Sequence, residues 1–204
     1  MCEILALSEH PHDHTFAVDR TQFIRALDLS DGSRLRSKWL AEGVPPVIHL
    51  SMHGNQDGIA LTSGENISWG ELREILMPIN ASMQNGLLVC LSTCYGYSGT
   101  RMDMYFDEKP PFWAIVGSGG DVTWGDSLQG FSTFYHHWFK GAAMLECAER
   151  MRQASGHSLF LGQAGKDSRS GYANYLRTGT FTVDTVSAPT TVTSLAEMFQ
   201  ARSS

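Results

Sequence analysis

The sequence has 204 residues and lacks several features that would assign it to a class of protein. It has no cluster of Lys and Arg dense enough for a nucleic-acid-binding face, and its formal net charge is −6, so we expect neither DNA nor RNA as a partner. No apolar run approaches the length of a membrane span, and residues 1–5 lack the basic segment of a secretory signal. We therefore expect a cytoplasmic protein with no membrane partner.

Cysteine is scarce, and its spacing argues against a disulfide scaffold. The four cysteines do not form the close-spaced framework of a small secreted domain. Because no export signal is evident, we expect them to be reduced thiols. They are Cys2, Cys90, Cys94 and Cys147.

Two histidines and two cysteines raise the question of a zinc site. His49 and His53 lie on one β-rich run, and Cys90 and Cys94 lie on another. On a strand, residues four apart share a face but are separated by about 13 Å, at roughly 3.3 Å per residue. One residue from each run can meet a metal, but four ligands cannot close around one ion. We expect no metal and no cofactor, and we expect Cys90 to be a core residue.

Apolar, β-rich runs alternate with helical segments along the chain. This alternation predicts an α/β fold with a mainly parallel sheet, and the absence of repeats or linkers predicts one domain over residues 1–204. The predicted strands cover residues 3–7, 47–53, 87–94, 112–116, 157–161 and 181–184, with a short hairpin arm at 58–61. The predicted helices cover residues 20–27, 34–41, 68–77, 127–140 and 142–155, with a further helix from 194 and a turn at 162–167.

Two of these apolar runs end in residues suited to nucleophilic catalysis. His53-Gly54 ends one run, and Cys94-Tyr95-Gly96 ends the next long one. A right-handed crossover places two parallel strands in one sheet with their carboxyl ends together, where α/β proteins build their sites. An imidazole and a thiol at that edge predict a Cys-His site, with Cys94 as nucleophile and His53 as general acid/base. The backbone N–H groups of Gly54 and Cys94 are candidates for holding an oxyanion.

The alternative interpretation is purely structural. An isolated cysteine is more often a small core residue than a nucleophile, and His53 can be a turn histidine whose hydrogen bonds are satisfied. Both residues, however, lie at strand ends beside glycine. That placement favours a catalytic role.

The same motifs resemble the clan CD cysteine peptidases, which include caspases, metacaspases and bacterial caspase-like and CHAT-domain proteins. Residues 48–54 (IHLSMHG), 57–59 and 67–72 resemble the histidine half of these enzymes. Residues 91–96 (LSTCYG) resemble their cysteine strand, and residues 114–118 resemble the strand that follows. The resemblance implies a caspase-like, three-layer α/β/α fold, a His53/Cys94 dyad and hydrolysis of peptide bonds in a protein or peptide substrate. By analogy it also suggests a prokaryotic defence or cell-death effector.

The resemblance also bears on substrate preference. In this clan the loop after the next strand helps to form the S1 pocket, and here that loop holds Asp121, Trp124 and Asp126 but no cation. The motif Gln-Ala-Cys of animal caspases is absent, and no arginine set matches their aspartate-binding pocket. Because the loop offers carboxylates and no cation, we expect cleavage after Lys or Arg rather than after Asp. Asp121 is the better candidate for pairing a cation, because Asp126 is expected to cap the following helix. A neutral pocket that accepts an apolar residue is the alternative.

Residues 97–111 form a polar segment closed by proline, directly after the cysteine. We predict a mobile loop there and expect it to be the site of any activating cut. A chain of this length has little room for a separate sensor domain. Control of activity would then come from an activating partner or ligand, from oligomerisation or from that cut.

Two other functions compete with peptidase activity. One is a caspase-like signalling or interaction module that does not hydrolyse its ligand. The other is a GDSL-type esterase, suggested by the sequence Gly125-Asp126-Ser127-Leu128. That block lies in mid-chain, and no Asp-x-x-His motif follows it, so a helix start is the preferred interpretation.

Overall fold

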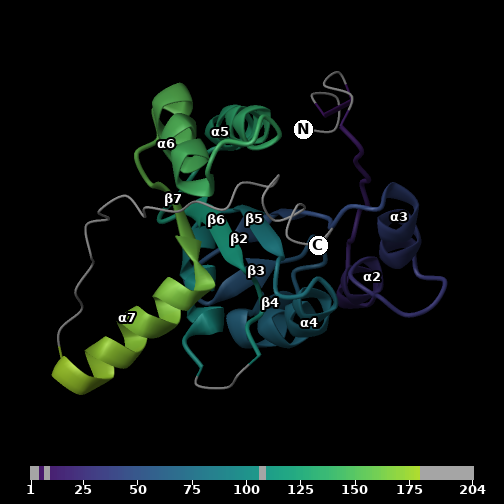
Figure 1. Ribbon diagram of the computed structural model, residues 1–204, viewed down its shortest axis with the longest axis horizontal. Coiled ribbons are helices and arrows are strands. Elements are labelled where there is room, and N and C mark those ends of the chain that lie inside the picture. The colour runs from purple at the N-terminus through teal and green to yellow at the C-terminus, as the bar shows by residue number, and fades with distance from the viewer. Residues whose placement is uncertain (1–4, 7–9, 106–108, 180–204) are drawn as a thin grey trace, which may run out of the picture.

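The main sheet has four strands and is mostly parallel, as the sequence predicts. The computed structural model describes residues 5–6, 10–105 and 109–179. Within them the sheet has the order β1-β5-β6-β7 (Figure 1). Neighbours β1, β5 and β6 run parallel, whereas β7 is antiparallel to β6. The strands are β1 (Ile48–Ser51), β5 (Leu88–Ser92), β6 (Ala114–Ser118) and β7 (Phe160–Ala164).

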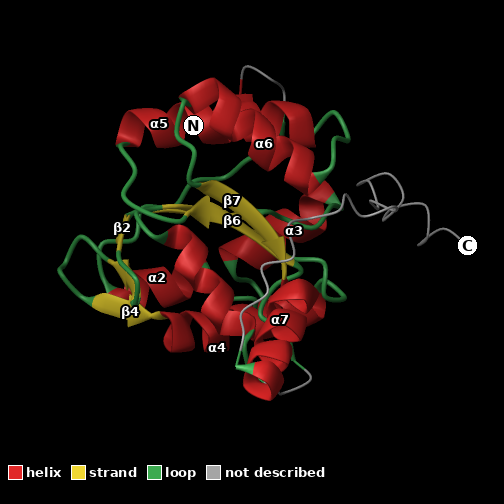
Figure 2. Ribbon diagram, turned by 90° about the vertical axis from the view of Figure 1, so that its left-hand side faces the viewer, coloured by secondary structure: helices red, strands yellow, loops and turns green. Residues whose placement is uncertain are grey.

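Helices cover both faces of this sheet, which gives three layers (Figure 2). Helices α5 (Trp124–Trp138) and α6 (Met144–Ser155) pack on one face, and α4 (Trp69–Ser82) lies on the other, with α2 (Arg20–Ala26) beside it. The layers follow from the two-residue period of a strand, because successive side chains point to opposite faces. In β5, residues 88 and 90 join the apolar cluster under α5 and α6, and residues 89 and 91 join the cluster under α4.

Helix α4 runs past the proline at which the sequence predicts its end. It begins at the predicted capping box, in which the Ser68 hydroxyl accepts from Glu71 N–H and the Glu71 carboxylate accepts from Ser68 N–H. Proline removes one helical hydrogen bond. Leu76 and Ile79, on either side of Pro78, are both buried. The buried face therefore continues across Pro78, and its packing outweighs that lost bond.

The segment after the cysteine differs from the predicted mobile loop. Residues Gly96–Asp103 form a 3₁₀ helix, η1, that packs on the sheet. Gly99 permits this contact, because an added Cβ would lie 2.7 Å from Ile115 Cδ1. Met102 is fully buried, and so are Thr100 and the Asp103 carboxyl, whose polarity suggested a loop. The prediction of mobility is wrong for this half of the segment.

The C-terminal part of the described chain contains a helix that was not predicted. Strand β7 lies three residues later than the predicted strand at 157–161, and it occupies part of the predicted turn. Helix α7 (Gly165–Thr178) follows directly. The Asp103 carboxylate would collide with a side chain at Gly165, so η1 packs against the start of this helix.

Three other predicted elements fall wholly or partly outside the described residues. The strand at 181–184 and the helix from 194 lie entirely outside them. Of the predicted strand at 3–7, only Leu5 and Ala6 are described, and both are helical.

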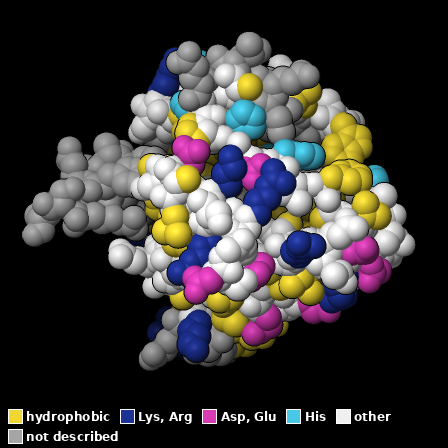
Figure 3. Space-filling model, turned by 90° about the vertical axis from the view of Figure 1, so that its right-hand side faces the viewer, with side chains coloured by type: hydrophobic (Ala, Val, Ile, Leu, Met, Phe, Trp, Pro, Cys, Tyr) yellow, Lys and Arg dark blue, Asp and Glu magenta, His cyan; other side chains and the backbone are white. Residues whose placement is uncertain are grey.

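Helices α2 and α3 (Arg34–Glu42) form the flank of the molecule, as predicted, and α3 ends at Gly43 in the left-handed conformation. Arg20 pairs with Glu71, and Arg36 pairs with Asp31. Figure 3 shows this face, on which Lys and Arg side chains lie among acidic and apolar ones. Exposed pairs of this kind each contribute about 0–1 kcal/mol.

A second, antiparallel sheet follows β1. It consists of β2 (His53–Gly54), β3 (Gly58–Ala60) and β4 (Asn66–Ser68). Only the hairpin arm at β3 was predicted. The chain passes from β1 of the main sheet into β2 of this small sheet. Because β2 begins with His53, the small sheet sets the position of the first candidate catalytic residue.

Candidate active site

Two neighbouring strands bring the predicted dyad residues to one edge of the main sheet. The last paired residues of β1 and β5 are Ser51 and Ser92, and Met52 N–H donates to Ser92 O at 3.3 Å. His53 and Cys94 each follow two residues later. The parallel register thus places the imidazole and the thiol at the carboxyl ends of adjacent strands, the usual position of sites in α/β sheets.

Cys94 lies in a tight turn at the end of β5. Tyr95 adopts the left-handed conformation, with φ of 55°, and Gly96 N–H donates to Thr93 O at 3.3 Å. A left-handed non-glycine residue is strained and persists only where its surroundings hold it. Here the Tyr95 N–H donates to Gly120 O at 2.9 Å. The loop that follows β6 therefore holds in place the turn that carries Cys94.

That loop also contacts the sulfur directly. Val122 N–H donates to Cys94 Sγ at 3.4 Å, and Sγ is 3.7 Å from Val122 O, to which the thiol can donate. Cys94 itself is partly exposed, so its sulfur is not sealed into the core.

A buried serine and a histidine, neither of them predicted as site residues, hold this loop. The Ser118 hydroxyl donates to Gly120 O at 2.9 Å and accepts from Gly120 N–H at 3.2 Å. Because its only hydrogen is directed at Gly120 O, the contact of 2.9 Å with His157 Nε2 requires the ring to donate. His157 thereby supports the carbonyl group that anchors Tyr95. No motif marks it, since it is distant in sequence from both strand ends.

His53 is exposed and lies beside an exposed tryptophan. Its ring packs at 71° to the Trp124 ring, with centroids 5.8 Å apart. Trp124 is the first residue of α5 and is 56% exposed. The predicted S1 residue Trp124 therefore adjoins the predicted acid/base.

The backbone of Gly54 lies against the cysteine turn. An added Cβ would collide with Thr93 Oγ1 and would lie 2.8 Å from Cys94 O. Asn55 N–H donates to Gly58 O, so the next rung, Gly54 with Ile59, is a non-hydrogen-bonded one. The Gly54 N–H consequently points away from β3 and is not used by the β2–β3 ladder.

The two aspartates of the predicted S1 loop have different surroundings. Asp121 is exposed. Asp126 lies in the first turn of α5, where its carboxylate accepts from the Thr123 hydroxyl at 2.8 Å. Thr123, rather than Asp126, is the N-cap of this helix, because its hydroxyl accepts from Asp126 N–H. The expectation that Asp126 caps α5 is corrected to this reciprocal pair, and Asp121 is the carboxylate left for a ligand.

A buried polar group lies behind the dyad, on the α5 side of the sheet. His49 pairs in register with Cys90, and a hydrogen bond of 2.8 Å joins His49 Nδ1 to the Tyr135 hydroxyl. Burial lowers the pKa of His49 to about 4 and raises that of Cys90 to about 12. Both side chains are therefore neutral near pH 7. This keeps the Cys90 thiol in its unreactive form.

The comparisons with known proteins do not extend these observations. No protein-family model matches the chain, and no curated protein matches it.

Ser127 of the esterase-like block is buried on α5, where a substrate cannot reach its hydroxyl. In the described part of the chain, no helix is long and apolar enough to cross a membrane.

Proposed function

We propose that this protein is a caspase-like cysteine endopeptidase that uses Cys94 and His53. The observation that carries the proposal is the register of β1 and β5, which presents the two side chains from adjacent strand ends. The contact between Val122 N–H and Cys94 Sγ and the close approach of Gly54 to the cysteine turn support it. A defence or cell-death role, with an activating partner or ligand, belongs to the same proposal by analogy.

The proposed reaction has two stages. His53 takes the Cys94 proton, and the thiolate attacks the carbonyl carbon of the scissile bond, which becomes a tetrahedral oxyanion. The N–H groups of Gly54 and Cys94 hold that oxygen. His53 then donates its proton to the leaving amine as the C–N bond breaks, leaving a thioester on Cys94. Water, deprotonated by His53, cleaves the thioester and releases the carboxylic acid.

For substrate preference, we propose that Asp121 and Trp124 bind a Lys or Arg side chain. The exposed carboxylate of Asp121 would pair the cation, and the exposed Trp124 ring would cover its aliphatic stem. Asp121→Ala should reduce turnover of Arg peptides by far more than turnover of Leu peptides. Efficient cleavage after Asp by the wild-type protein, with Arg peptides refused, would contradict this preference.

A peptide-library cleavage assay tests the activity itself. Cys94→Ala should abolish turnover, and His53→Ala should lower it by several orders of magnitude, because residues of one catalytic unit fail together. Cys90→Ala is the matched control, since it removes a thiol from the same strand and should leave turnover largely intact.

Labelling with a peptidyl electrophile separates the competing functions. A peptidase is labelled at Cys94 in a reaction that needs His53, whereas an esterase is labelled at Ser127. A signalling module is labelled selectively at neither residue. Loss of turnover in Cys90→Ala but not in Cys94→Ala would overturn the assignment.

A further inference from the structure

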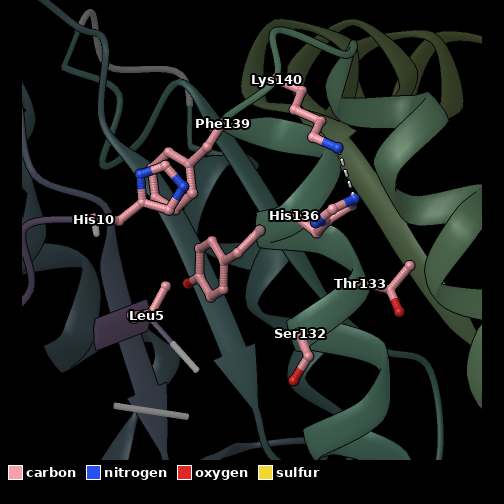
Figure 4. Close-up of a pocket in the computed structure, with 8 residues that line it drawn as sticks. Leu5, His10, Ser132, Thr133, His136, Phe139 and Lys140 are labelled. Carbon is pink, nitrogen blue, oxygen red and sulfur yellow. Dashed lines mark hydrogen bonds between the residues drawn. The ribbon is translucent and has the colours of Figure 1, made fainter. Parts of the chain in front are cut away.

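A cavity of about 600 Å³ lies on the far end of α5 from Trp124 (Figure 4). Its walls come from α5, from the two residues that follow the helix and from the N-terminal segment that contains His10. The volume is within the range of pockets that hold small organic molecules, which is about 300–1,000 Å³. None of the catalytic or specificity residues proposed above lines it.

In the part of the chain that the structure describes, one side of this cavity carries a single cationic side chain, Lys140. Lys140 Nζ lies 3.0 Å from His136 Nε2, and because the ammonium group has only donors, the imidazole accepts. This contact supplies no negative charge, so the charge of Lys140 is not cancelled by it. Among the described residues that line the cavity, none is acidic. This side is suited to an anionic group.

The opposite side is aromatic. His10 stacks on Phe139 with ring centroids 3.9 Å apart, and the rings of Tyr135 and Phe139 lie 5.8 Å apart at an angle of 21°. Figure 4 shows His10 over Phe139 on this side of the cavity, and Phe139 is still 37% exposed. A planar ring of a ligand would pack against this aromatic side.

Two hydroxyl groups complete the lining. Thr133 Oγ1 donates to Gln129 O at 3.0 Å, and Ser132 Oγ donates to Leu128 O, both within α5. Their hydrogens are used by the helix, so each oxygen can only accept from a ligand. A ligand that carries an N–H or O–H group as well as its anionic group matches this arrangement.

We propose that this cavity binds a small organic anion that carries a planar ring. Lys140 pairs with the anionic group, Phe139 packs on the ring, and the hydroxyls of Ser132 and Thr133 accept from ligand donors. The proposal concerns a site separate from the dyad and does not depend on peptidase activity.

Calorimetric titration of the full chain tests this site with defined probes. Adenosine 5′-monophosphate and indole-3-acetate supply a phosphate and a carboxylate, each joined to a planar ring. Adenosine and indole-3-acetamide are their uncharged counterparts. At least one anion should bind saturably, and its uncharged counterpart should bind about tenfold more weakly or less, since it lacks the charge that pairs with Lys140. Which anion binds identifies the source of the charge.

Variants and nuclear magnetic resonance locate the binding. Lys140→Gln should weaken the anion about tenfold, whereas Lys166→Gln, at an exposed position on α7, should leave it unchanged. Phe139→Ala should weaken the anion and its uncharged counterpart alike. Chemical-shift changes should centre on residues 132–140. Absence of saturable binding by both anions, equal affinity for charged and uncharged probes, or shift changes centred elsewhere would overturn the proposal.

Discussion

Three described cysteines differ in how far their sulfur can be reached. Cys90 and Cys147 are buried, and burial raises the pKa of each thiol to about 12. Cys94 is partly exposed at its turn. We therefore expect iodoacetamide at pH 8 to alkylate Cys94 in the folded protein and to reach the other two only after unfolding. Peptide mapping by mass spectrometry measures this, and early modification of Cys90 in the folded protein would contradict it.

His49 makes stability depend on pH. Its pKa is lowered from 6.5 to about 4 by burial, so between these values the unfolded chain binds a proton that the folded chain does not. Stability should therefore fall as pH drops from about 6.5 toward 4, by about 3 kcal/mol at most from this group. Urea unfolding at several pH values measures the loss.

The variant His49→Gln isolates that contribution. The glutamine side chain has both a donor and an acceptor for the Tyr135 hydroxyl but does not titrate. The dependence of its unfolding free energy on pH between 4 and 6.5 should be shallower than that of the wild-type protein. Parallel curves for the two proteins would show that His49 does not titrate as proposed.

At the scale of single elements, β2 lies close to the cysteine turn because Gly54 has no side chain. Gly54→Ala places a methyl group on Thr93 Oγ1 and within 2.8 Å of Cys94 O, so β2 and the turn must separate. We expect a lower melting temperature and a loss of turnover of at least about tenfold, because small displacements at a reacting centre are costly.

The control for this substitution is Gly70→Ala. A Cβ there lies no closer than 3.8 Å to Tyr105 Oη, and the residue is in the first turn of α4. Its stability should be unchanged or slightly higher, since alanine is the better helix former. Equal behaviour of the two variants would mean that the close approach at Gly54 does not matter.

The elements that the sequence predicted well are those with a local signal. The capping box at Ser68 and the glycine stop at Gly43 each depend on neighbouring residues, and both are confirmed. The end of α4 and the fold of η1 depend on distant partners. Burial of Ile79 carries α4 past Pro78, and the contact of Gly99 with Ile115 orders η1. No local pattern shows such contacts.

The candidate site also has a part that the sequence predicts and a part that depends on distant contacts. The position of His53 and Cys94 at one sheet edge could be predicted, because it needs only two strand ends and a parallel connection. The contacts of Val122 with the sulfur and of His157 with Ser118 depend on the path of two loops. Loop paths are set by tertiary contacts, so a single sequence did not indicate them.

At the scale of the whole molecule, the connection between η1 and β6 links the part of the chain that carries His53 and Cys94 to the part that carries Val122 and Trp124. Because η1 is packed on the sheet, the predicted activating cut is now expected within residues 104–111 rather than across 97–111. Intact-mass measurement of the incubated protein would detect it. A cut mapped within η1, or a fully active sample with no cut, would remove this prediction.

Because β6 lies between β5 and β7, a chain cut in the connection between η1 and β6 should stay together. The first fragment would carry His53 and Cys94, and the second would carry Val122 and Trp124. The β5–β6 ladder joins them, and both apolar clusters draw residues from each side, with Phe112 in one and Leu88 in the other. The two polypeptides should therefore remain a stable heterodimer, co-eluting in gel filtration until denaturant is added. Expressed separately and mixed, they should complement each other, since neither fragment alone holds a complete site.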